Sequence, residues 1–133
     1  MALKSYHGKY LVAESDGAAN ADRDNRGIWE TFTINDLGSS KVSLLSYHGK
    51  YLVAEDENAG YEINANRDGR GAWEEFTVVK QAGGKIALKT AHGRYVVAES
   101  DGRLRGDRTA AGIWESFTPE CISGICIFYE NQM

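Results

Sequence analysis

Three histidines recur at equivalent places in this sequence, and histidine is the side chain that most readily exchanges a proton near neutral pH. They are His7, His48 and His92, spaced 41 and 44 residues apart. A catalytic histidine needs its own nucleophile and its own orienting partner. The three copies instead share similar neighbours, which favours a fold role or a repeated binding role. We therefore expect no enzyme. We interpret these residues as turn histidines bonded to backbone groups, with ligand contact as the alternative.

A second repeated group places an acid or amide directly before an arginine. Carboxylate, amide and guanidinium groups make directional hydrogen bonds that suit sugar hydroxyls and acidic sugar substituents. We interpret these pairs first as structural bridges in which the arginine binds a carboxylate and holds a hairpin, with ligand contact as the alternative. Together with the histidines, these pairs and the arginines that follow two of them form the candidate ligand-binding set. Its members are His7, Asp22, Arg23, Arg26, His48, Asn66, Arg67, Arg70, His92, Asp107 and Arg108.

A tryptophan occurs once in each copy of a third motif, Gly-x-Trp-Glu-x-Phe-Thr. The three are Trp29, Trp73 and Trp114. An exposed tryptophan would offer a platform on which sugar rings or bases stack. Because each one lies three residues before a phenylalanine in an apolar segment, we predict instead that the tryptophans belong to the core. The acidic residues of the motif also occur three times, unlike the two unequal carboxylates of a glycoside hydrolase.

These residues lie in three copies of one sequence repeat. Ser5–Glu14 and Ser46–Glu55 both read SYHGKYLVAE, and Thr90–Glu99 reads TAHGRYVVAE. Each copy predicts four strands. The first has alternating apolar residues, and a His-Gly turn leads to a second strand rich in β-formers. A further hairpin turn leads to the third strand, Ala18–Asp22 in the first copy, and the fourth strand contains the tryptophan motif. A three-residue insertion within residues 56–63 explains the unequal spacing and is expected in a surface loop.

Twelve short strands in pseudo-threefold order predict an all-β fold. Closing the sheet into a barrel removes exposed edges, and three units are too few to close a propeller. We therefore predict a β-trefoil, a six-stranded barrel capped by three hairpins. It is expected to form a single domain over residues 1–133, with repeats at about 1–41, 42–84 and 85–123. Residues 124–133 are expected to pair beside the N-terminal strand and close the barrel.

Composition excludes several function classes. The formal net charge is −4 without a long basic run, which argues against a nucleic-acid partner. No apolar stretch is long enough for membrane insertion, and no apolar leader begins the chain, so we expect a cytoplasmic protein or one secreted without a visible signal peptide. The spacing of histidine and cysteine predicts no metal site and no cofactor. The sequence leaves open whether Cys121 and Cys126 are bridged.

The segments HGKYLVAE, followed by Asp-Gly, and GGKIALK at Gly83–Lys89 resemble the fascin-like β-trefoil family. The resemblance extends over all three repeats, roughly residues 2–118. It implies a β-trefoil fold. It also implies actin binding, because the family includes fascin, which bundles actin, and hisactophilin, a single-domain actin-binding protein.

Repetition of exposed positions is the observation on which the predicted function depends. Ten identical residues exceed what a shared core requires, since Lys9 and Lys50 are kept as well. Three weak sites on one body give avidity for a repetitive ligand. We therefore predict a non-enzymatic, multivalent, lectin-like carbohydrate-binding protein with three similar sites for glycans or glycoconjugates. The alternative is a cytoskeletal protein that binds actin filaments.

Overall fold

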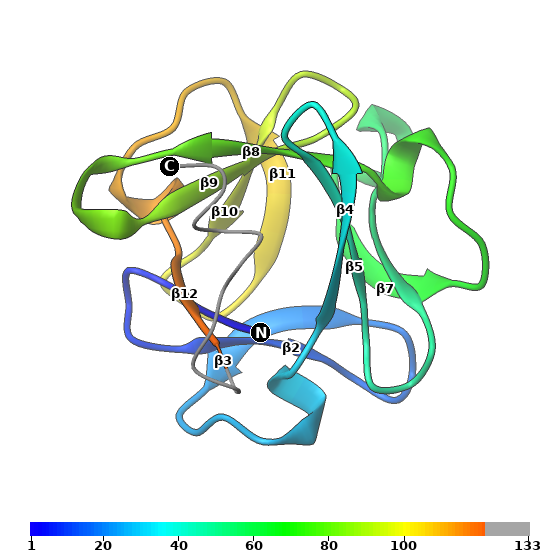
Figure 1. Cartoon of the computed structure of the whole chain (residues 1–133), viewed down its shortest axis with the longest axis horizontal. Coiled ribbons are helices and arrows are strands. Elements are labelled where there is room, and N and C mark those ends of the chain that lie inside the picture. Colours follow the sequence, from blue (N-terminus) through cyan, green and yellow to red (C-terminus); the bar gives the residue numbers. More distant parts are fainter. Residues whose placement is uncertain (122–133) are drawn as a thin grey trace.

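Short strands joined by tight turns make up the computed structural model, which describes residues 1–121 (Figure 1). The strands are β1 (Ala2–Lys4), β2 (Tyr10–Ala13), β3 (Ala19–Arg23), β4 (Thr33–Gly38), β5 (Lys41–Leu45), β6 (Tyr51–Ala54), β7 (Ile63–Arg67), β8 (Phe76–Lys80), β9 (Ile86–Lys89), β10 (Tyr95–Ala98), β11 (Leu104–Arg108) and β12 (Thr118–Glu120). The 3-10 turns are η1 (Ile28–Glu30), η2 (Glu57–Ala59), η3 (Ala72–Glu74), η4 (Ala82–Gly84) and η5 (Ile113–Glu115). The predicted all-β class is confirmed.

The barrel-like part of the molecule is a nearly closed ring of paired strands. β4 pairs with β5, β5 with β8, β8 with β9, and β12 with β1. Two backbone links bridge the remaining gaps. Phe32 N donates to Met1 O at 2.8 Å beside β1, and Phe117 N donates to Ile86 O at 2.7 Å beside β9.

Three hairpins, β2–β3, β6–β7 and β10–β11, stand outside this ring and bind one another (Figure 1). Each hairpin donates one backbone hydrogen bond to a second hairpin and accepts one from the third. The bonds run from Ala21 N to Gly102 O at 2.7 Å, from Ala65 N to Gly17 O at 2.8 Å, and from Gly106 N to Tyr61 O at 2.7 Å. The three repeats are therefore joined in a closed cycle.

The turns of these hairpins approach their neighbours closely. Gly102 has a φ of +92°, and a Cβ at this position would lie 2.7 Å from the Cβ of Asp22. A Cβ at Gly17 would likewise lie 2.8 Å from the Cβ of Asn66. Only glycine tolerates both the left-handed backbone and the lack of space for a Cβ atom. Tyr61 takes the equivalent place in the second repeat with a φ of +56°.

The core lies inside the barrel and is apolar. The alternating residues predicted for the first strand of each repeat, Leu3, Val42, Leu44, Ile86 and Leu88, are all buried. The phenylalanines of the tryptophan motif, Phe32, Phe76 and Phe117, are among the largest fully buried side chains.

The prediction that the tryptophans lie in the fourth strand was wrong. Residues 28–30, 72–74 and 113–115 form 3-10 turns, and the strand begins only after them. The cause is local: the glutamate side chain of each turn accepts a hydrogen bond from the backbone N–H of the preceding glycine, at 2.6 Å for both Gly27 and Gly112. This capping interaction bends the chain where a strand would continue straight.

The predicted closing strand, residues 124–133, lies outside the described residues, as does Cys126. Within the described residues, the antiparallel neighbours of β1 are β2 and β12. Leu3 of β1 lies opposite Pro119 of β12.

Replacing a core phenylalanine should cost far more stability than replacing an exposed side chain of the same motif. Phe117→Ala is expected to lower the free energy of unfolding by about 3–5 kcal/mol because it leaves a large cavity. Ile113, which is 60% exposed, should give a change within about 0.5 kcal/mol on replacement by alanine. Urea denaturation monitored by tryptophan fluorescence measures the change in the free energy of unfolding for both variants. Equal losses would contradict the packing described above.

Candidate functional site

Each predicted histidine links two repeats. Its turn is held locally, as in the first repeat, where Gly8 has a φ of +79° and its N–H donates to Ser5 O at 3.0 Å. From this turn the histidine Nε2–H donates to the carbonyl of the alanine that ends the second strand of the preceding repeat. The pairs are His7 with Ala98 at 3.0 Å, His48 with Ala13 at 3.0 Å and His92 with Ala54 at 2.9 Å. These contacts match the expected turn histidine bonded to backbone.

Each histidine ring also packs edge-on against a tryptophan of the preceding repeat. We call these contacts junction 1–2 (Trp29 and His48), junction 2–3 (Trp73 and His92) and junction 3–1 (Trp114 and His7). The ring centroids are 4.7, 4.8 and 4.7 Å apart, respectively. The three histidines therefore lie in three separate places, each beside an aromatic ring.

The prediction that the tryptophans belong to the core was wrong. Trp29 and Trp114 are half-buried, and Trp73 is 38% exposed. The 3-10 turn explains this placement: it directs the following phenylalanine inward and leaves the tryptophan at the surface over a histidine. The tryptophans thus contact both a neighbouring repeat and solvent.

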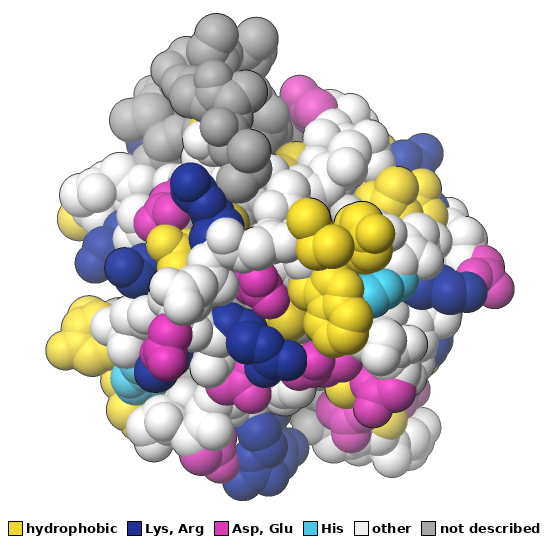
Figure 2. Space-filling model, turned by 90° about the horizontal axis from the view of Figure 1, so that it is seen from below, with side chains coloured by type: hydrophobic (Ala, Val, Ile, Leu, Met, Phe, Trp, Pro, Cys, Tyr) yellow, Lys and Arg dark blue, Asp and Glu magenta, His cyan; other side chains and the backbone are white. Residues whose placement is uncertain are grey.

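Exposed apolar side chains gather at the same junctions. All the large hydrophobic side chains that are exposed among the described residues lie there: Ile28 and Tyr47 at junction 1–2, Trp73 at junction 2–3, and Tyr6 and Ile113 at junction 3–1. Figure 2 shows hydrophobic side chains beside a histidine on one face, amid charged side chains of both signs. Clustered apolar exposure of this kind is typical of a binding surface.

Junction 2–3 differs from the other two because alanine replaces both large side chains. Ala72 stands where the others have isoleucine, and Ala91 stands where they have tyrosine. These two alanines line a hollow of about 410 Å³ together with Lys41, Glu75, Thr77, Lys89, Thr90 and Gly93. At junction 3–1, Tyr6 and Ile113 line the equivalent hollow. The small side chains explain why Trp73 is the most exposed of the three tryptophans.

The insertion of the second repeat supplies a replacement ring at junction 2–3. The ring centroid of Tyr61 lies 6.4 Å from that of His92. The guanidinium of Arg94 lies over the Tyr61 ring, 5.2 Å from its centroid. Tyr61 has a left-handed backbone, which is rare for a bulky residue and marks a conformation that its surroundings enforce.

The predicted Asp/Asn–Arg pairs are held by internal ion pairs. Each arginine binds its preceding acid or amide and also the glutamate that ends the second strand of its repeat. The glutamate contacts are Arg23 to Glu14 at 2.6 Å, Arg67 to Glu55 at 2.7 Å and Arg108 to Glu99 at 2.9 Å. This is the structural bridge that we expected from the sequence. Contact of these groups with a ligand stays a prediction.

Two arginines show the electrostatic balance of this bridge. Burial lowers the pKa of Arg23, but its hydrogen bond to Glu14 and the charge of Asp22 outweigh burial, so that the pKa is raised above its usual value. The pKa of Arg108 is raised in the same way: burial opposes the shift, and the charges of Asp107 and Glu99 outweigh it.

The arginines that follow two of the pairs behave differently. Arg26 binds Glu120 at 2.8 Å, and the same carboxylate accepts a hydrogen bond from the Tyr10 hydroxyl at 2.8 Å. That hydrogen bond raises the pKa of Tyr10 above its usual value. Arg70 is exposed and forms no ion pair with another described residue.

The structure brings only part of the candidate set together. His7 and Asp22 line one hollow of about 240 Å³ with Lys9, Glu99 and Asp101. The remaining candidates are distributed over the three repeats. Sequence reasoning missed Tyr6, Ile28, Tyr47 and Ile113. Their signal was a large side chain directly before each repeated histidine or tryptophan, with alanine at both places only at junction 2–3.

No group of three or more histidine, cysteine, aspartate or glutamate side chains within residues 1–121 is arranged to hold a metal ion. Over the same range, no helix is both long and apolar enough to cross a membrane.

Fold and surface together define an all-β repeat protein whose exposed apolar side chains collect at three junctions between repeats. A family model matches residues 1–121, and the chain belongs to that family, the domain of unknown function DUF7910. No curated protein matches the sequence.

Removing one junction histidine should destabilise the protein without removing a core side chain. His48→Ala leaves the Ala13 carbonyl without its donor and the Trp29 ring without its partner, so we expect a loss of about 1–3 kcal/mol in the free energy of unfolding. His48→Gln retains a side-chain donor and should lose less. Thermal and urea denaturation of both variants test this. Wild-type stability in His48→Ala would contradict the link between repeats.

Proposed function

We propose that this chain is a non-enzymatic β-trefoil domain that binds carbohydrate at its junctions between repeats. The observation that carries the proposal is the confinement of the large exposed hydrophobic side chains to these junctions. The cyclic hydrogen bonds among the three hairpins and the nearly closed ring of strands support the trefoil arrangement.

Aromatic and aliphatic side chains at a surface suit sugars because a pyranose ring has apolar C–H faces and polar edges. An exposed ring stacks on such a face, while nearby polar groups bind the hydroxyls. Each junction combines an aromatic pair with neighbouring polar side chains. Three such places on one rigid body would give avidity for a repetitive glycan.

Junction 2–3 is the strongest of the three candidate sites. Ala72 and Ala91 line its hollow of about 410 Å³, whereas Tyr6 and Ile113 line the hollow of about 390 Å³ at junction 3–1, and Trp73 lies next to Ala72 in the chain. Polar groups line the hollow. Thr77 lies opposite Lys41 on one neighbouring strand and opposite Lys89 on the other, and Glu75 is close by. The two ammonium groups can donate hydrogen bonds to sugar hydroxyls, and the carboxylate can accept them.

The site is tested by filling the hollow with the side chain that the other repeats carry. Ala91→Tyr restores the residue found at Tyr6 and Tyr47 and should reduce polysaccharide binding at junction 2–3. Trp73→Ala should weaken the affinity by about twofold to tenfold through loss of stacking. Ala91→Ser is the matched control, because it leaves the hollow open. Affinity electrophoresis against neutral and acidic polysaccharides, with a glycan array, measures the effect.

Two outcomes would overturn this assignment. One is the absence of binding to any glycan; the other is binding that Ala91→Tyr and Trp73→Ala leave unchanged. Co-sedimentation with actin filaments, run in parallel, tests the actin-binding alternative, which stays a prediction from the sequence resemblance. No described contact favours it over carbohydrate binding.

A further inference from the structure

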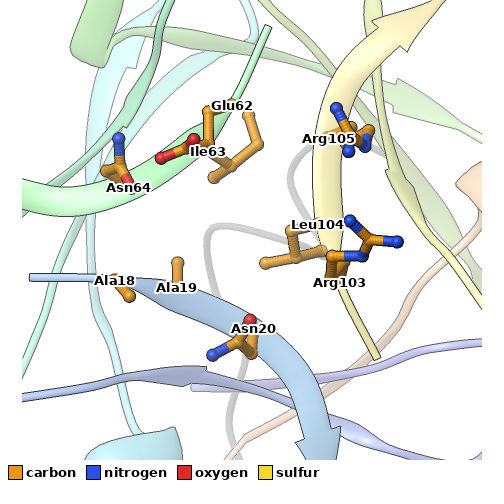
Figure 3. A pocket seen from close by; sticks show the side chains of 9 residues that line it. All are labelled: Ala18, Ala19, Asn20, Glu62, Ile63, Asn64, Arg103, Leu104 and Arg105. Carbon is orange, nitrogen blue, oxygen red and sulfur yellow. The ribbon is translucent and has the colours of Figure 1, made fainter. Parts of the chain in front are cut away.

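A separate hollow lies where the three hairpins meet, apart from the junctions. It is lined by three consecutive residues from each repeat at the beginning of β3, β7 and β11, and its volume is about 190 Å³. Three isolated bridges connect these segments in a cycle, pairing Ala18 with Asn64, Asn20 with Arg103, and Glu62 with Arg105. Figure 3 shows the middle side chains, Ala19, Ile63 and Leu104, pointing toward one another from the three segments. We call this space the axial hollow.

The axial hollow exists because the three repeats are unequal at its floor. Two repeats supply a large apolar side chain, Ile63 and Leu104, whereas the first supplies only Ala19. All three are buried. A third large side chain would occupy the centre. The floor that these three side chains form is apolar.

The rim of the axial hollow is polar and carries charges of both signs. The third rim position is Asn20 and Asn64 in the first two repeats and Arg105 in the third. The amide nitrogens of both asparagines donate to glutamates at 3.1 Å, which orients them. Arg105 forms no ion pair with a described residue, and its guanidinium donates to Gly60 O at 3.5 Å.

Neither of the other charged rim residues, Glu62 or Arg103, forms an ion pair with Arg105. Arg103 is engaged by Asp101 at 2.8 Å, and Glu62 is an exposed residue without an ion pair among residues 1–121. Asp101 balances the charge of Arg103, and Glu62 carries the opposite charge to Arg105, so Arg105 is the rim cation left without an ion pair within residues 1–121. A guanidinium without a carboxylate partner beside an apolar floor favours an anionic ligand with an apolar body.

We propose that the axial hollow binds a carboxylate carried on a sugar ring, the chemistry of a uronic acid residue. Its volume of about 190 Å³ exceeds what a simple anion needs and suits a six-membered ring. The ring lies over the floor, where only small parts of Ile63 and Leu104 are exposed. Arg105 binds the carboxylate, and the oriented asparagines bind ring hydroxyls. This site is independent of the junctions, so either proposal can fail alone.

Isothermal titration with D-glucuronate and D-galacturonate tests the proposal, with glucose and acetate as comparison ligands. At least one uronate should bind, and both glucose and acetate should bind at least about tenfold more weakly. Ala19→Leu copies Leu104 into the first repeat and should abolish uronate binding. Arg105→Gln should weaken it by about tenfold or more. Lys80→Gln is the matched control, because it removes the same charge from β8, outside the axial hollow, and should leave binding unchanged.

NMR chemical-shift mapping locates the site independently of affinity. Uronate should perturb the backbone amides of residues 18–20, 62–64 and 103–105 and leave those of junction 2–3 unmoved. The proposal is overturned by the absence of uronate binding, by an Ala19→Leu variant that folds and binds normally, by an effect of Arg105→Gln no larger than that of Lys80→Gln, or by equal binding of acetate. Binding of neutral glycans lost only in Ala91→Tyr would support the junction site alone.

Discussion

The hydrogen bond from each histidine Nε2–H to an alanine carbonyl of the preceding repeat is the contact around which the three units assemble. It satisfies a carbonyl at the end of a strand and places the imidazole against a tryptophan. That tryptophan in turn belongs to the 3-10 turn that sends phenylalanine into the core. Since His7 binds Ala98, the first repeat is tied to the third as firmly as to the second. The arrangement leaves large apolar side chains at the junctions, where they are available to a ligand.

Most of the fold could be predicted from the sequence because the same pattern of apolar strand residues and turn residues occurs three times. Alternation at Leu3, Val42 and Ile86 predicted buried strands, and the His-Gly pairs predicted tight turns; both agree with the structure. The tryptophan motif was misread because a short apolar run does not distinguish a strand from a 3-10 turn. What decides between them is the hydrogen bond from the glycine N–H to the glutamate side chain, a single side-chain contact.

The candidate sites were harder to predict because they are built from residues of different repeats. The histidine at position 48 and the tryptophan at position 29 are both visible in the sequence, but their contact depends on how two repeats dock. The same holds for the axial hollow, where Ala19 matters only because Ile63 and Leu104 face it. By contrast, the Arg–Glu bridges lie within the hairpin of one repeat, and an Arg–carboxylate bridge was the interpretation that the sequence favoured for these arginines.

Tyr61 has a consequence for folding specificity. The first two repeats share an identical ten-residue segment, so those residues carry no information about which neighbour they should dock against. Near-identical units in one chain invite exchange between molecules and docking in the wrong order. Tyr61, which has a left-handed backbone, contacts the third repeat through its carbonyl, which accepts from Gly106 N–H, whereas glycine (Gly17 or Gly102) stands at the equivalent place in the other two repeats. Because only the second repeat carries this insertion, the contact of Tyr61 with the third repeat distinguishes the second repeat from the first.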